Sequence, residues 1–200
     1  MIFTVEIAKP AAKQLRKVPQ HIVDNLMIWL AAVEHDGLQE VRKVPGYHDE
    51  PLKGERAGQR SIRLSRAYRA IYEVKGGTAK FVSIEEVSKH DYEEASMRKV
   101  KKSDAMKLLE KLAGGPLTLG RAIESVRKSE ELSQDECAEK LGVSKSHLCD
   151  VEKGRKTVSP ERAAKWARVL GYPESVLVRL AIQGGLDAAG LRYKVEIEAA

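Results

Sequence analysis

The chain has 200 residues, which is enough for one medium-sized domain or two small ones. Its hydrophobic fraction of 42% is ordinary for a folded protein, and its formal net charge of +6 favours a polyanionic partner. No apolar run approaches the roughly 18 residues that a membrane span needs, and the start MIFTVEIAKP is too short and too acidic for a signal peptide. We therefore expect a cytoplasmic protein.

The first hundred residues alternate between strand and helix patterns. Residues 2–7 (IFTVEI) alternate and are rich in β-branched side chains, which predicts a strand. Lys9-Pro10 opens a helix, and a second helix begins near Pro19 and ends near His35, with apolar residues on one face. Residues 36–59 contain many glycines, prolines and charges, and we expect a loop there.

Three further strands complete this part of the chain. They are predicted over residues 60–65, 68–74 and 79–87, and the sequence Lys75-Gly76-Gly77 is typical of a tight hairpin between the last two. The pattern β-α-α-β-β-β predicts an α+β domain over residues 1–94, in which an antiparallel sheet carries two helices.

The second half of the chain is predicted to be helical. Residues 95–116 form a polar linker with a short helix that begins at Ser103 and carries Met106, Leu109 and Leu112. An all-α domain is predicted over residues 117–185. The tail over residues 186–200 contains LRYKVEIEA, which alternates like a strand but has no neighbouring strand with which to pair.

A helix-turn-helix unit is predicted between Ser133 and Gly154. Ser133 and Glu136 have the spacing of a capping box, and Gly142 follows the first helix, where the turn needs a positive φ. Ser144 caps the next helix, and Leu148 and Val151 turn inward from it. This arrangement leaves the start of the second helix exposed, as is required for entry into the major groove of DNA.

The spacing and both flanking helices resemble the Xre/Cro-type helix-turn-helix family over about 65 residues. We expect Lys145, Ser146 and His147 to reach base edges, with Ser144 at the start of the same helix. We expect Gln134 to meet a phosphate, and the segment KGRK to add phosphate contacts through Lys153, Arg155 and Lys156. An ordinary helical hairpin with solvated charges is the alternative.

The strand-rich half carries basic side chains on its predicted sheet. In the strand 60–65, Ile62 and Leu64 face one side, so Arg63 faces the other. Arg69 lies at the start of the next strand, and Lys53 lies in the loop before the strand 60–65. The last strand leads into Ser88-Lys89-His90-Asp91-Tyr92. Three cations beside a His and a Tyr suit chemistry on a phosphodiester, because cations stabilise the developing charge. A cationic surface without chemistry is the alternative that composition alone favours.

The elements LKG, RAGQRSIRL and YRAI and the ending SKHDY resemble the RelE/HigB toxin superfamily nearly end to end over residues 1–94. The resemblance implies a small mRNA interferase that cuts mRNA in the ribosomal A site without a metal. It also implies that Lys53, Arg63 and Arg69 stabilise the phosphate, while His90 and Tyr92 handle protons or stack on a base and Asp91 orients them. Some members carry an arginine where this chain has Lys89-His90, so the identity of the general base stays open.

The helical half further resembles the HigA-like antitoxins that accompany such toxins. The whole chain then resembles a fused type II toxin–antitoxin protein: a ribosome-dependent endoribonuclease that is neutralised by its DNA-binding, autoregulating partner half. The expected partners are a palindromic DNA operator, mRNA on the ribosome for the free toxin half, and a second copy of the chain. The alternative is a non-enzymatic transcription regulator with a degenerate partner-binding domain.

Neither reading requires a metal or a cofactor. Cys137 and Cys149 lack metal-ligand spacing, and both fall on predicted helices, where we expect small, buried apolar side chains. A metal-dependent nuclease is disfavoured, since no set of His, Asp and Glu residues has ligand spacing.

Overall fold

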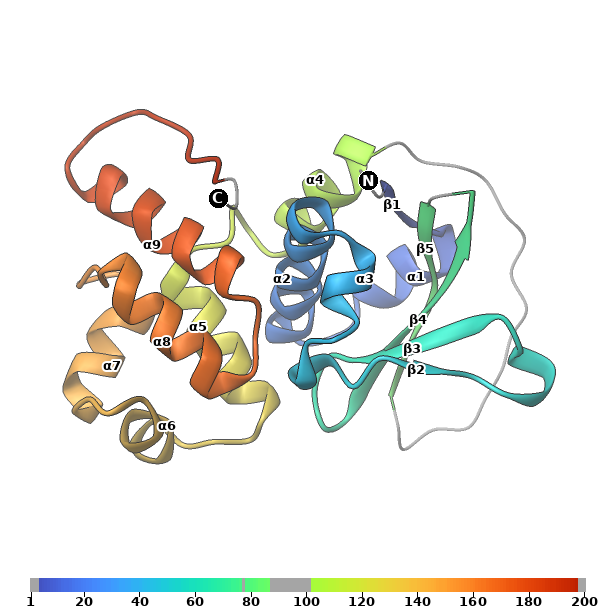
Figure 1. Cartoon of the computed structure of the whole chain (residues 1–200), viewed down its shortest axis with the longest axis horizontal. Coiled ribbons are helices and arrows are strands. Elements are labelled where there is room, and N and C mark those ends of the chain that lie inside the picture. The colour runs from blue at the N-terminus through green and yellow to red at the C-terminus, as the bar shows by residue number, and fades with distance from the viewer. Residues whose placement is uncertain (1–3, 77, 87–101, 198–200) are drawn as a thin grey trace.

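The computed structural model describes residues 4–76, 78–86 and 102–197 (Figure 1). A mixed β-sheet with helices on one face forms one part, and helices α5 to α9 form the other. The strand-rich part consists of β1 (Thr4–Ile7), α1 (Lys9–Leu15), α2 (Gln20–Asp36), α3 (Leu38–Val41), β2 (Glu50–Pro51), β3 (Gln59–Arg63), β4 (Tyr68–Lys75) and β5 (Thr78–Glu86). Then follow α4 (Lys102–Leu112), α5 (Leu119–Ser129), α6 (Gln134–Leu141), α7 (Lys145–Glu152), α8 (Pro160–Leu170) and α9 (Glu174–Ala188).

The sheet differs from the expected one in direction. Its strand order is β1-β5-β4-β3-β2, and β1 runs parallel to β5 whereas the other neighbours are antiparallel. The prediction of an antiparallel sheet was therefore wrong for β1. Helices rather than a tight hairpin follow β1, and such a connection leaves a strand free to lie parallel to its partner.

The segment 36–59 was predicted to be a loop, but it contains regular structure. Helix α3 starts after Gly37, whose φ of 83° turns the chain sharply away from α2. Leu38 and Val41 are fully buried on α3, so this short helix belongs to the core. Two short 3-10 helices (Pro45–Tyr47 and Gly54–Arg56) and the two-residue strand β2 follow it. Helices and strands this short contain too few residues to show a periodic pattern of apolar side chains in the sequence.

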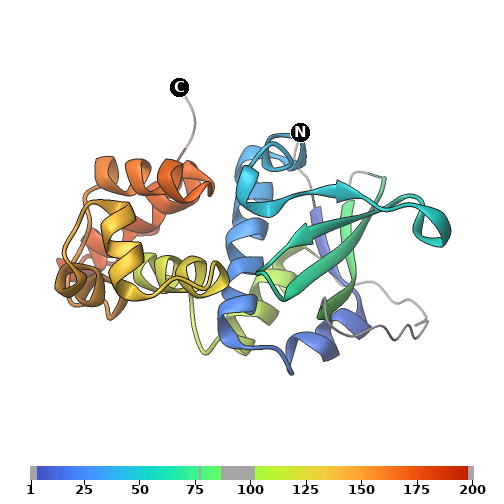
Figure 2. The same ribbon diagram turned by 90° about the horizontal axis from the view of Figure 1, so that it is seen from below.

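Helix α2 lies between the sheet and the helical part, as the view from below shows (Figure 2). Residues 22–30 are buried on every side, which is the pattern of a helix in the middle of a core. The predicted bounds of this helix, from near Pro19 to near His35, are confirmed. Because α2 packs against both α5 and α9, the buried apolar side chains of both parts form one continuous cluster.

Helix α4 packs against α2 and β1 of the strand-rich part. Leu109 and Ala105 are completely buried there, and Met106 and Leu112 are packed against the same core. The apolar stripe of the predicted short helix therefore docks on the sheet domain.

A buried polar network joins α2 to α5. The amide of Asn25 donates to the Leu64 carbonyl (2.7 Å) and to the Ser129 hydroxyl (2.6 Å), and Ser125 donates to Asn25 Oδ1 (2.8 Å). At the edge of this network, Arg121 of α5 forms an ion pair with Asp24 of α2. These groups are satisfied only when the two parts are docked, so the network fixes how they are oriented.

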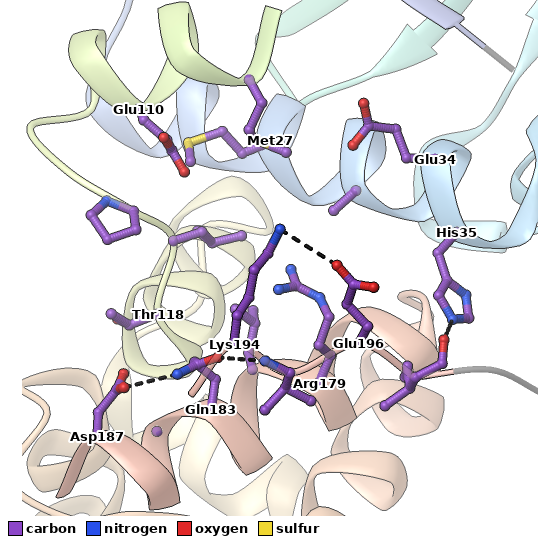
Figure 3. Close-up of a pocket in the computed structure, with 18 of the residues that line it drawn as sticks. Met27, Glu34, His35, Glu110, Thr118, Arg179, Gln183, Asp187, Lys194 and Glu196 are labelled. Atoms are coloured by element: carbon purple, nitrogen blue, oxygen red, sulfur yellow. Dashed lines mark hydrogen bonds and ion pairs between the residues drawn. The ribbon is translucent and has the colours of Figure 1, made fainter. Parts of the chain in front are cut away.

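The described tail, residues 191–197, contains no strand, contrary to its alternating pattern. It crosses a cavity of about 680 Å³ between α2, α4 and α9, where Gln183 holds the backbone of Tyr193 and Val195 (Figure 3). The carbonyl of Ile197 accepts from His35 at 2.5 Å. Burial lowers the pKa of Arg179 in this cavity, but none of the predicted site residues lines it.

Among the described helices, none is long and apolar enough to span a membrane.

Candidate nucleic-acid interface

The helix-turn-helix unit is formed by α6 and α7. Ser133 accepts from the Glu136 backbone N–H (3.2 Å), and the Glu136 carboxylate accepts from the Ser133 backbone N–H (2.7 Å), which confirms the predicted capping box. Gly142 ends α6 in the left-handed region at φ 68°, where a side chain would strain the turn. Ser144 then caps α7 by accepting from the His147 N–H.

A buried ion pair fixes α7 against the rest of the unit. Arg127 of α5 donates to both carboxylate oxygens of Glu152, at 2.6 and 3.0 Å, and Gln134 of α6 donates to Glu152 at 2.8 Å. The bond to Glu152 raises the pKa of Arg127, so this guanidinium stays charged. The side-chain amide of Gln134, which was predicted to contact a phosphate, therefore donates to Glu152. The backbone N–H of Gln134 at the start of α6 remains a candidate for the phosphate contact.

A close backbone approach completes this packing. A side chain at Gly120 of α5 would meet the Val151 carbonyl oxygen at 2.2 Å and the Glu152 carbonyl oxygen at 2.9 Å. Sequence reasoning missed Gly120, Arg127 and Glu152. In the sequence, these three residues stand at helix positions where the spacing predicts buried apolar side chains. A glycine and two opposite charges at such positions were the signal that could have identified them.

The start of α7 presents side chains outward. Lys145 and Ser146 are exposed, and Lys145 forms an ion pair with Asp135 of α6 at 2.6 Å. His147 lies differently, since its ring packs edge-on against Trp166 with centroids 6.4 Å apart. Its Nε2 is enclosed and has no hydrogen-bond partner among the described residues. Of the predicted base-reading residues, Lys145 and Ser146 are therefore the two that are oriented for contact.

The basic segment after α7 is held by one carboxylate. Arg155 donates to Asp150 Oδ1 at 2.6 Å, and Lys156 pairs with Asp150 Oδ2 at 3.0 Å, while Lys153 is exposed. These two bonds lower the pKa of Asp150. The three cations therefore follow the end of α7 as a positively charged border, which suits phosphate contacts.

The predicted catalytic residues of the strand-rich part are brought together only in part. Arg63 and Arg69 lie directly opposite each other on β3 and β4, so they project from the same face, as expected. Arg63 lies 3.2 Å from His48 Nε2, and Arg69 donates to the Ser61 hydroxyl at 3.3 Å. Lys53 is exposed on the preceding loop, and no hydrogen bond or ion pair joins it to another described residue.

His90, Asp91 and Tyr92 lie outside the residues that the structure describes. Within the described ranges, no group of His, Cys, Asp and Glu residues could hold a metal ion, and Cys137 and Cys149 are free thiols. Cys137 is fully buried, as predicted, whereas Cys149 is only half-buried.

Comparisons with known proteins agree with this geometry. Residues 123–177 match the family model described as helix-turn-helix, which covers α6, α7 and α8 and parts of α5 and α9. The "ImmF control region 10 kDa protein" of Bacillus phage phi105 is 36% identical over 75 residues, which are 36% of this chain and 83% of that protein. No solved structure matches the chain significantly, and the resemblance of residues 1–94 to RelE/HigB toxins has no counterpart among these matches. Through its helical part, the chain belongs to the helix-turn-helix family of DNA-binding transcription regulators.

Proposed function

We propose that the protein is a transcription regulator that binds a palindromic operator as a homodimer, with the start of α7 in the major groove. The observation that carries this proposal is the exposed, capped start of α7 with Lys145 and Ser146 free of the core and a basic border behind it. Two such helices about one helical turn of DNA apart would read two half-sites. The operator is expected near the promoter of the protein's own gene.

The proposal is tested by a gel-shift titration of the full chain on its own promoter DNA, combined with sedimentation of the complex. The expected result is a complex with two chains on one palindromic site. Binding that is equally tight to a scrambled duplex of the same length would contradict a specific regulator. One chain per site would contradict the dimer.

A second candidate function is a latent mRNA interferase in the strand-rich part, as its resemblance to RelE/HigB toxins implies. One observation favours it over a purely partner-binding domain: Arg63 and Arg69 lie opposite each other on one sheet face, where two guanidinium groups can hold a phosphodiester. The proposed roles are phosphate stabilisation by Lys53, Arg63 and Arg69, and proton transfer or stacking by His90 and Tyr92, with Asp91 as the orienting residue.

The test for this activity is cleavage of a translated mRNA on purified ribosomes. Arg69→Ala should lower the cleavage rate by about 10²-fold or more, as the loss of one charge-stabilising donor usually does. If no variant or condition yields cleavage, the strand-rich part is a partner-binding domain, which is the alternative reading.

A further inference from the structure

The turn between α5 and α6 places two carboxylates on the β3–β4 hairpin. Glu130 Oε2 lies 3.3 Å from Arg63 Nη2, and Glu131 Oε2 lies 3.3 Å from Arg66 Nη1. The backbone N–H of Arg66 donates to the Ser129 carbonyl at 3.2 Å, so the turn and the hairpin also share a main-chain bond. We call Glu130 and Glu131 the acidic turn.

The acidic turn ends α5 with one residue in the left-handed region. Glu131 has φ 58°, in the left-handed region that favours glycine or asparagine after a helix. Its neighbours bond as in an ordinary helix end, with the Leu132 N–H donating to the Arg127 carbonyl at 3.0 Å. The Glu131 carboxylate pairs with Arg66, and both side chains are more than half exposed, at 60% and 54%.

Opposite the acidic turn lies a group of basic side chains, which we call the cationic cluster: His48, Arg63, Arg66 and Arg69. Two of its arginines, Arg63 and Arg66, pair with Glu130 and Glu131, and Arg69 stands directly opposite Glu85 of β5. The side chains of Arg63 and Glu130 are 21% and 27% exposed, so this pair is only partly shielded from water and an anion from solvent can compete for it.

The chemistry of the cluster fits a phosphodiester backbone. Guanidinium groups donate in a planar fork that matches phosphate oxygens as well as carboxylates. Arg63 and Arg69 stand on neighbouring strands, about 5 Å apart, so both can reach one or two successive phosphates of a single strand. The Glu130 carboxylate that pairs with Arg63 occupies a place that a phosphate oxygen could take.

We propose that the cationic cluster is a binding site for the backbone of single-stranded nucleic acid, and that the acidic turn occupies this site in cis. The proposal deepens the second candidate function and rests on it for the kind of ligand. A single-stranded ligand must displace the carboxylates of Glu130 and Glu131 before it can bind the arginines. The helix-turn-helix body, rather than α4 or the tail, is then the part of the chain that covers the site.

The test measures binding of a fluorescein-labelled 12-nucleotide oligouridylate RNA by fluorescence anisotropy at about 0.1 M salt. All proteins are full-length and carry Lys145→Gln and Lys153→Gln, which weaken nucleic-acid binding by the helix-turn-helix unit. Against this background, Glu130→Gln with Glu131→Gln should tighten RNA binding about tenfold, which corresponds to one charge-assisted contact. Adding Arg63→Gln and Arg66→Gln should cancel this gain.

The matched control is Glu124→Gln on α5, the helix that leads into the acidic turn, whose carboxylate pairs with Lys128 on the surface. It removes one negative charge, the same change as in Glu131→Gly and half of the change in the double variant, and should leave RNA affinity within about twofold. Glu131→Gly provides a second variant, which releases Arg66 while relaxing the backbone, so a folding defect cannot hide the effect. An equal gain in Glu124→Gln, a gain that survives loss of the arginines, or no gain in either acidic-turn variant would overturn the proposal.

RNA cleavage is followed in the same samples on ribosomes. Tighter binding without cleavage supports the site and contradicts the ribonuclease. Cleavage without any change in RNA binding would contradict the proposal that the acidic turn occupies the cationic cluster. It would leave the proposed ribonuclease activity in place.

Discussion

Arg127 and Glu152 form a two-bond ion pair that joins α5 to the last residue of α7, the second helix of the helix-turn-helix unit. Their side chains are 12% and 4% exposed. Helix α5 also packs against α2 of the strand-rich part, so one helix contacts both the DNA-reading unit and the sheet domain. The position of α7 therefore depends on a charge pair that is shielded from water.

Arg127→Gln should destabilise the protein by about 3–5 kcal/mol, because it leaves the Glu152 carboxylate buried without its charged partner, with the neutral amide of Gln134 as a remaining donor. Urea unfolding followed by circular dichroism measures the change. Lys128→Gln is the control, since its pair with Glu124 is exposed and should contribute less than about 1 kcal/mol. Equal losses in the two variants would show that the buried pair has no special role.

Gly120→Ala should destabilise the helix-turn-helix unit, because the new methyl group would meet the Val151 carbonyl at 2.2 Å. Overpacking of this kind typically costs about 1–3 kcal/mol. Gly184→Ala on α9 is the matched control: nothing lies within 4 Å of the added carbon, and alanine should favour the helix by about 0.5–1 kcal/mol. Thermal unfolding of both variants tests the close approach, which would be refuted if Gly120→Ala were neutral.

Leu109→Ala should destabilise the strand-rich part by about 2–5 kcal/mol, since Leu109 of α4 is completely buried against it. Consequently, a fragment that ends at residue 94 should unfold more easily than one that ends at residue 116. Denaturant unfolding of the two fragments and of the full-length variant measures this. Equal stability of both fragments would mean that α4 adds nothing to the sheet domain.

Docking of the tail should weaken as the pH rises. The pKa of His35 is raised mainly by its hydrogen bond to Asp36 and also by the bond to the Ile197 carbonyl, because only the imidazolium donates through both nitrogens. Asp36 is the next residue on α2, so its bond to His35 does not depend on the tail, and docking raises the pKa only through the Ile197 carbonyl. The stabilisation by docking is therefore complete below the pKa of His35 in the undocked state and is lost as the pH rises through the docked value.

Hydrogen exchange of residues 191–197, corrected for the intrinsic pH dependence, should show more protection at pH 5.5 than at pH 8. His35→Asn should remove that difference. Protection that increases with pH in the parent protein would contradict this role of His35.

The sequence predicted those elements that show a periodic apolar pattern or that depend on neighbouring residues alone. The period of α2, the capping box of α6 and the glycine after it are all local, and each is confirmed. The parallel direction of β1, the short helix α3 and the irregular tail were not predictable, because each depends on contacts with distant residues. The register of Arg63 against Arg69 was anticipated from alternation. Glu130 lies beside Arg63 only because the two parts pack together, and His48 lies there because of how the segment 36–59 folds.

We expect the start of α7 to read bases while the basic border holds phosphates. This expectation is tested by measuring affinity for an operator selected from random duplexes and for a scrambled duplex, each at several salt concentrations. Lys145→Ala or Ser146→Ala should lower the operator-to-scrambled affinity ratio by about 5- to 150-fold, equivalent to about 1–3 kcal/mol. Lys153→Ala should weaken both duplexes alike and reduce the salt dependence. A ratio that is unchanged by the α7 variants but falls in Lys153→Ala would contradict the account.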